Sequence, residues 1–125
     1  MWRHKLELDA TDLEAAFRRA WKQAHQTPRI GLLNEESEKN WWRAIVRQVL
    51  NGLGKPSDFE TLFDDLWFTF AEPRRWRLYD GIPEIFISLK KRGFRLAILS
   101  NWDKRLRRIL EGLDLVRFFE LIIIS

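Results

Sequence analysis

The feature that most restricts how this chain can fold is a pair of short apolar runs near the C-terminus, residues 94–99 and 121–124. Short apolar runs bounded by polar residues are typical of buried strands in a parallel sheet. The segment between them, from about Asp103 to Gly112, has apolar residues at helical spacing. Its inward positions are Leu106, Ile109, Leu110 and Leu113. A strand–helix–strand order of this kind predicts two parallel neighbouring strands.

Another helix is expected before the first run. It is predicted to begin at Gly81-Ile82-Pro83, because proline in the first turn gives up no hydrogen bond, and to end at Gly93. Its expected buried face is Ile82, Ile85, Phe86 and Leu89.

The N-terminal half is predicted to be entirely helical, over residues 9–72. Three apolar stripes with the spacing of an amphipathic helix begin at Leu13, Trp42 and Phe59. Asn34 is a predicted N-cap for the middle helix. The predicted capping boxes of the other two helices are Thr11-x-x-Glu14 and Ser57-x-x-Glu60.

Composition excludes several kinds of site. The 125 residues include no cysteine, which rules out disulfides, thiolate metal ligands and cysteine nucleophiles, and two histidines argue against a histidine metal site. No apolar run approaches the roughly 20 residues that span a bilayer, and the N-terminal MWRHKLELDA lacks the apolar core of a signal peptide. We therefore expect a cytoplasmic protein without membrane contact.

Positive charge is concentrated in residues 74–108. This segment holds eleven Lys or Arg against three Asp or Glu, whereas the whole chain carries a net charge of only +4. Such a segment can meet phosphate, nucleic acid or an acidic partner, and charge alone does not choose among them.

Ser100 and Asn101 are the most chemically informative residues. They follow the first predicted strand and precede a helix, the place where ligands bind in open α/β sheets and where a helix N-terminus attracts anions. Lys104 and neighbouring arginines add positive potential. The residues alone leave two interpretations open: an anion site, or a simple helix cap with solvated basic side chains.

A family resemblance favours the first interpretation. The segment Arg92-Gly93-x-x-Leu-Ala-Ile-Leu-Ser100-Asn101, followed by a helix and Gly-Leu-x-Leu-x-x-Phe-Phe-Glu120, resembles the second motif region of haloacid dehalogenase-like (HAD) hydrolases. The upstream Trp-Arg-Leu-Tyr-x-Gly-Ile-Pro of residues 76–83 resembles the linker from their helical cap to a Rossmann-like core. The helices before it resemble that cap, of the type inserted after the first core strand.

The resemblance implies a role for some residues and leaves others missing. Ser100 matches the motif-two residue that hydrogen-bonds the transferring phosphoryl group, and Asn101 matches the polar residue that often follows it. The pair also occurs in the dehalogenase branch, so it does not separate that branch from the phosphatases. The nucleophilic Asp, the later Lys and the acidic pair that completes the Mg²⁺ site match nothing in this sequence.

The predicted fold is thus α/β and helix-dominated: a three-helix cap over residues 1–75 and a truncated Rossmann-like core over residues 76–125. The predicted function is a HAD-like hydrolase, a phosphatase acting on a phosphorylated small molecule in its complete form. Because the nucleophile and metal motifs are absent, we expect the chain to be inactive alone and to hold no cofactor itself, with Mg²⁺ required by the complete protein.

The tryptophans divide into two groups. Trp21, Trp42 and Trp67 lie on apolar stripes and are predicted to pack in the core. Trp41 and Trp102 are expected to be exposed, and with Lys104 they are the candidate substrate contacts.

Two other functions remain open. The strand at residues 94–99 is predicted to have a bare edge, which would pair with a second copy of the chain or a complementing fragment. The basic residues 74–108 could bind nucleic acid, although a hinge between cap and core explains Arg74–Arg77 better.

Overall fold

The computed structural model describes residues 4, 6–27 and 34–124. Contacts divide the chain into two compact units, Met1–Trp67 and Phe68–Ser125. The assignment of residues 1–75 to a cap domain and 76–125 to a core domain stays a prediction.

The first unit is helical, as the three apolar stripes predict. Its helices are α1 (Ala10–Ala24), α2 (Glu35–Leu50) and α3 (Phe59–Thr69), the last of which runs two residues into the second unit. Small residues of α1 pack against branched residues of α2 in one buried cluster: Ala16, Ala20, Ile45 and Val49. A second buried cluster joins the segment before α1, the last residue of α2 and the first half of α3: Leu6, Leu50 and Leu62.

Two of the three predicted N-caps are wrong in position. The carboxylate of Asp9 accepts hydrogen bonds from the backbone N–H groups of Thr11, at 2.9 Å, and Asp12, at 3.2 Å, so α1 begins before the predicted Thr11 box. At α3 the cap is Asp58, whose carboxylate accepts from the backbone N–H and hydroxyl of Thr61. These bonds hold the pKa of Asp58 below its usual value.

The cap of α2 is confirmed at Asn34. Its side chain accepts from the backbone N–H of Ser37 at 2.8 Å, and the Ser37 hydroxyl accepts from the Asn34 N–H at 2.9 Å. This reciprocal pair satisfies two of the N–H groups that a helix start leaves unpaired.

The second unit contains a helix–strand–helix–strand sequence, as predicted. Its main elements are α4 (Ile82–Lys91), β1 (Ala97–Ser100), α5 (Arg105–Gly112) and β2 (Leu121–Ile124), and its short 3₁₀ helices are η2 (Pro73–Arg75) and η3 (Val116–Phe118). Gly81 and Gly93 flank α4 with φ of +84° and +87°, which glycine adopts without strain.

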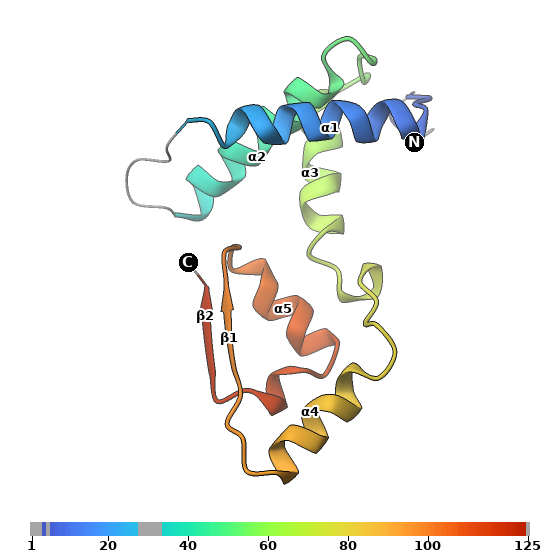
Figure 1. The fold of residues 1–125 in the computed structure, drawn as a ribbon. Coiled ribbons are helices and arrows are strands. Elements are labelled where there is room, and N and C mark those ends of the chain that lie inside the picture. Colours follow the sequence, from blue (N-terminus) through green and yellow to red (C-terminus); the bar gives the residue numbers. More distant parts are fainter. Residues whose placement is uncertain (1–3, 5, 28–33, 125) are drawn as a thin grey trace. The chain divides into compact units, whose positions relative to one another are not determined.

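The parallel pairing of the two strands is confirmed. β1 and β2 run in register from Ala97 opposite Leu121 to Ser100 opposite Ile124. Figure 1 shows them side by side with α5 along one face. On that face Ile98 and Ile122 pack against a buried cluster that α5 and η3 supply: Leu110, Leu115 and Phe118.

The expectation of a fully buried strand is wrong for the opposite face. Leu99 is 78% exposed, Leu121 54% and Ile123 45%, because alternate residues of a strand point to opposite faces and no described element of this unit covers this one. The first strand is also shorter than residues 94–99. Ile85 of α4, expected inside, is 52% exposed for the same lack of a covering element.

Candidate functional site

Ser100 and Asn101 lie where β1 ends. Ser100 is the last residue of the strand and is half-buried, and Asn101 is exposed in the bend that follows. Neither side chain makes a hydrogen bond to another described residue. A hydroxyl and an amide at the carboxyl end of a parallel strand are therefore available to a ligand.

The helix after them begins later than the sequence suggests, and its first N–H groups are occupied. The N–H of Arg105 donates to Asp103 Oδ1 at 2.9 Å, that of Leu106 to the Asp103 carbonyl at 3.1 Å, and that of Arg107 to the Lys104 carbonyl at 3.3 Å. The expected contribution of this helix N-terminus to an anion site is thus wrong. An anion here would depend on the two side chains and on the N–H groups of the bend.

Asp103 is the feature of this loop that the sequence analysis missed. Its carboxylate is 7% exposed and meets the guanidinium of Arg105 in two places, Nε to Oδ1 at 2.9 Å and Nη2 to Oδ2 at 2.8 Å. A bidentate pair of this kind is geometrically specific and neutralises both charges. An Asp two residues before an Arg at a helix start is the only signal for it in the sequence.

The candidate substrate contacts differ in where they lie. Lys104 is exposed in the same loop as Ser100. Trp102 is half-buried rather than exposed, because its ring packs on Trp76 with centroids 5.2 Å apart at 58°. Trp41 belongs to the other unit and is also half-buried, with its ring 5.8 Å from that of Trp21. The substrate role of all three residues stays a prediction.

The three tryptophans that were predicted to pack in the core differ in how deeply they are buried. Trp67 is buried, and Trp42 is half-buried against the α1–α2 cluster. Trp21 is 38% exposed at the edge of the same cluster. Its position on an apolar stripe does not bury it, because in the described residues no third helix closes over that end.

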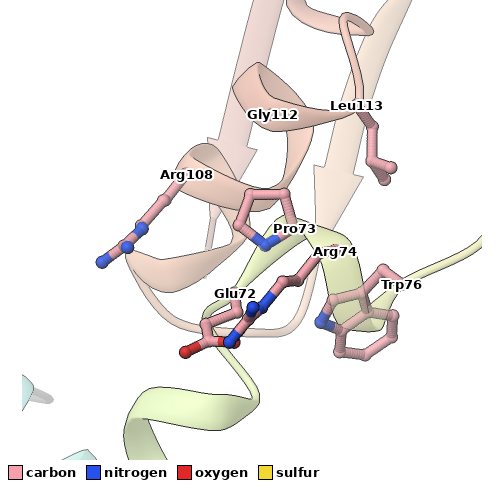
Figure 2. A pocket seen from close by; sticks show the side chains of 7 residues that line it. All are labelled: Glu72, Pro73, Arg74, Trp76, Arg108, Gly112 and Leu113. Carbon is pink, nitrogen blue, oxygen red and sulfur yellow. The ribbon is translucent and has the colours of Figure 1, made fainter.

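A shallow pocket of about 570 Å³ lies beside Trp76 (Figure 2). The ring of Pro73 sits against the last turn of α5 at Gly112, and Arg108 extends away from it. In the same pocket Arg74 Nε donates to Glu72 Oε2 at 2.8 Å, and this bond holds the pKa of the Glu72 carboxyl below its usual range. Ser100 does not line this pocket.

A second, mostly apolar pocket of about 500 Å³ adjoins β1. We call it the β1 groove. Its lining includes Leu78, Ile82 and Phe86 from the segment before the strand, and Ile98 and Leu99 of the strand itself. Within the described part of the chain β1 pairs with β2 alone, so one edge of β1 carries backbone groups without a strand partner.

The described residues do not fit the magnesium site that the family resemblance implies for the complete protein. Among residues 4, 6–27 and 34–124, no three carboxylate or imidazole side chains converge on a point that could hold a metal ion. The carboxylate closest in sequence to Ser100 is Asp103, and it is engaged by Arg105.

Comparison with known proteins identifies the family. No family model matches the chain. It is 34% identical over 125 residues to the human haloacid dehalogenase-like hydrolase domain-containing protein 3 and 33% identical over 125 residues to the cattle protein of that name, an alignment that takes in 98% of this chain. The zebrafish protein of that name is 30% identical over 123 residues, or 96% of this chain. The chain belongs to the haloacid dehalogenase-like hydrolases.

This HAD-like chain spans about half the length of the curated relatives it matches, 50% of the human and cattle proteins and 51% of the zebrafish protein. The match includes both units. The helical unit is therefore part of the family likeness, together with the segment around Ser100.

Two further features concern the helices and the charged side chains of the described residues. No helix in the described residues is long and apolar enough to cross a membrane. In the basic segment 74–108, Arg74 and Arg75 meet Glu72, Arg95 meets Glu120, and Arg105 meets Asp103, so part of its positive charge is neutralised locally.

Proposed function

We propose that this chain is the phosphate-holding part of a HAD-like phosphatase whose substrate is a phosphorylated small molecule. One observation carries the proposal: the side chains of Ser100 and Asn101 make no hydrogen bond to another described residue, and they stand at the carboxyl end of a parallel strand in a chain of this family. The Ser100 hydroxyl and the Asn101 amide would donate hydrogen bonds to phosphate oxygens. Lys104 would add positive potential to the same loop.

The chain alone is proposed to be inactive. Phosphoryl transfer through an aspartyl intermediate needs a carboxylate nucleophile positioned in line with the phosphate and cations that neutralise its charge. Asp103, the carboxylate in the loop, is held by Arg105 and by the backbone N–H of the same residue. A carboxylate with both oxygens engaged is a poor nucleophile, so the loop lacks a candidate for that role.

Hydrolysis of a generic phosphate monoester tests this part of the proposal. The purified chain is assayed with and without Mg²⁺ beside a Ser100→Ala variant. The proposal expects no turnover above that of the variant. Turnover that depends on Mg²⁺ and is lost in Ser100→Ala would mean that the chain contains a nucleophile and a metal site, and would overturn the proposed inactivity.

The β1 groove supports a second candidate function, assembly through the exposed edge of β1. An unpaired strand edge between apolar side chains is a template for another strand. In a solution of the purified chain that strand comes from a second copy, and in the complete protein it would come from a complementing segment. Leu99, 78% exposed at this edge, and the groove-lining Phe86 would both be covered.

Light scattering over a wide concentration range tests the assembly. If the edge of β1 pairs with a second copy, the average mass in solution should rise with protein concentration. Leu99→Lys should abolish this rise, because a charge on the edge opposes strand pairing. Arg95→Lys, an exposed conservative change outside the groove, is the matched control. A strictly monomeric wild-type chain would count against assembly by self-pairing.

Nucleic-acid binding is not favoured, because several cations of residues 74–108 already have carboxylate partners. A cytoplasmic location remains a prediction from the composition.

A further inference from the structure

The loop that carries Ser100 touches a distant segment through two tryptophans. The Trp102 ring, two residues after Ser100, packs on the Trp76 ring with centroids 5.2 Å apart. Trp76 is itself held, because its indole N–H donates to the carbonyl of Phe70 at 2.8 Å and its backbone N–H donates to the carbonyl of Pro73 at 3.0 Å. The position of the Trp76 ring is thus fixed by its own turn.

The turn of residues 70–76 is itself packed against α5. Gly112, the last residue of the helix, lies so close to Pro73 that a Cβ on Gly112 would overlap the proline ring. The other end of the loop is tied to the same helix by the pair between Asp103 and Arg105. The Ser100–Asp103 loop is therefore held at one point by α5 itself and at a second point, Trp102, by a turn packed on α5.

We propose that Trp76 is a positioning residue for Ser100 and Asn101 and acts through Trp102. The proposal rests on the proposed function, in which these two side chains hold phosphate. Asn101 lies outside the β1–β2 ladder, so strand pairing does not fix its backbone. Without the contact to Trp76, the bend would sample more conformations, and binding phosphate would require the loss of that freedom.

The exposure of Trp76 distinguishes this role from core packing. The side chain is 37% exposed and does not belong to the buried cluster of Leu110, Leu115 and Phe118. Removing a partly exposed ring outside the cluster should change the loop it touches more than the strands and helices of the unit. Such a change removes the ring contact with Trp102, the indole hydrogen bond to the Phe70 carbonyl and a weaker edge contact to the Phe70 ring at 6.4 Å.

The test compares Trp76→Ala and Trp76→Phe with the wild-type chain by nuclear magnetic resonance. Backbone ¹⁵N relaxation of Asn101 and Trp102 is measured first without ligand, and each protein is then titrated with inorganic phosphate. Trp76→Ala is expected to increase loop mobility and to weaken phosphate binding by about threefold to tenfold, the value of one aromatic pair. Trp76→Phe keeps a ring to pack on Trp102 but loses the indole bond to the Phe70 carbonyl, and it is expected to retain most of the loop order and most of the phosphate affinity. Phe94→Ala, at a 53% exposed aromatic of the same unit, should change neither.

Two results would overturn the proposal: loop relaxation unchanged in Trp76→Ala, or loss of loop order in Phe94→Ala to the same extent. The relaxation measurement needs no ligand, so it tests whether Trp76 orders the loop independently of phosphate binding. If phosphate shifts no loop signal in the wild type, the proposed function is refuted, but the relaxation result still shows whether Trp76 orders the loop. If Trp76→Ala does not fold, Trp76→Leu, which keeps apolar volume without an aromatic face, replaces it under the same criteria.

Discussion

Substitution of Gly112 by alanine tests the packing that anchors the turn of residues 70–76. The side chain would enter space that the ring of Pro73 occupies, and neither group can move away easily, because one is a helix backbone and the other a rigid ring. Overpacking of this kind costs about 1–3 kcal/mol, and the overlap with two ring atoms places this site in the upper half of that range.

Helix propensity acts in the opposite direction. Alanine is favoured over glycine by up to about 1 kcal/mol inside a helix, and by less at a last residue such as Gly112. The steric cost exceeds this gain, so Gly112→Ala should lower the free energy of unfolding of the second unit by about 1–2 kcal/mol. For a unit of this size that corresponds to a fall in Tm of roughly 4–8 °C for each kcal/mol.

Hydrogen exchange at the amides of Ile98 and Leu110 measures this change in the second unit alone. Glu111→Ala, on the exposed side of the same turn, is the control and should have little effect. In a Pro73→Gly background the ring is gone, and Gly112→Ala should become neutral or stabilising. A Gly112→Ala chain as stable as the wild type would show that Pro73 does not occupy that space, and would contradict the packing between Pro73 and α5.

Other substitutions test local interactions. Asp9→Ala should destabilise the first unit by about 1 kcal/mol in thermal unfolding followed by circular dichroism, whereas Thr11→Ala should have a much smaller effect, because the cap is Asp9. Equal effects would contradict this assignment. Because the pKa of Glu72 is lowered on folding, its contribution to stability is present at neutral pH and is lost as the pH falls below about 4. Glu72→Gln should thus approach the wild type in stability in acid, and a constant difference across pH would count against the Arg74 contact. Asp103→Asn removes the charge from one side of a mostly buried ion pair and should cost about 2–4 kcal/mol in denaturant unfolding, so a change under about 1 kcal/mol would contradict the buried pair.

The strand pairing could be predicted because its signal is local and strong. Two apolar runs separated by one helix leave few arrangements other than parallel neighbours, and the glycines at both ends of α4 marked its limits. The exposed face of the sheet could not be predicted. Ile98 and Leu99 lie on opposite faces of the strand and are both apolar, so the sequence is the same whether one face or both are covered. An apolar pattern shows that a face can be buried, but it does not show that another element covers it.

The candidate site was predictable in its residues and not in its geometry. Ser100 and Asn101 lie at the expected strand end, but the helix after them starts at Arg105, because the Asp103 carboxylate turns back to that residue. An Asp just before a helix is typical of a helix start, and the same Asp followed by an Arg also allows an ion pair. The sequence does not distinguish these two roles for Asp103. The contact between Trp76 and Trp102 joins residues 26 positions apart, beyond the reach of any spacing rule.

Titration of the ¹⁵N-labelled chain with inorganic phosphate is the decisive test of whether Ser100 and Asn101 bind an anion. We expect the backbone signal of Asn101 and its side-chain amide to shift in a saturable way, and sodium chloride at matched ionic strength not to reproduce the shifts. A hydrogen bond to a charged group contributes about 1.5–3 kcal/mol, so Ser100→Ala should weaken binding by roughly tenfold or more, and Ser100→Thr should retain it. Loop signals that do not move, or that move equally in Ser100→Ala, would contradict the claim that Ser100 and Asn101 hold phosphate.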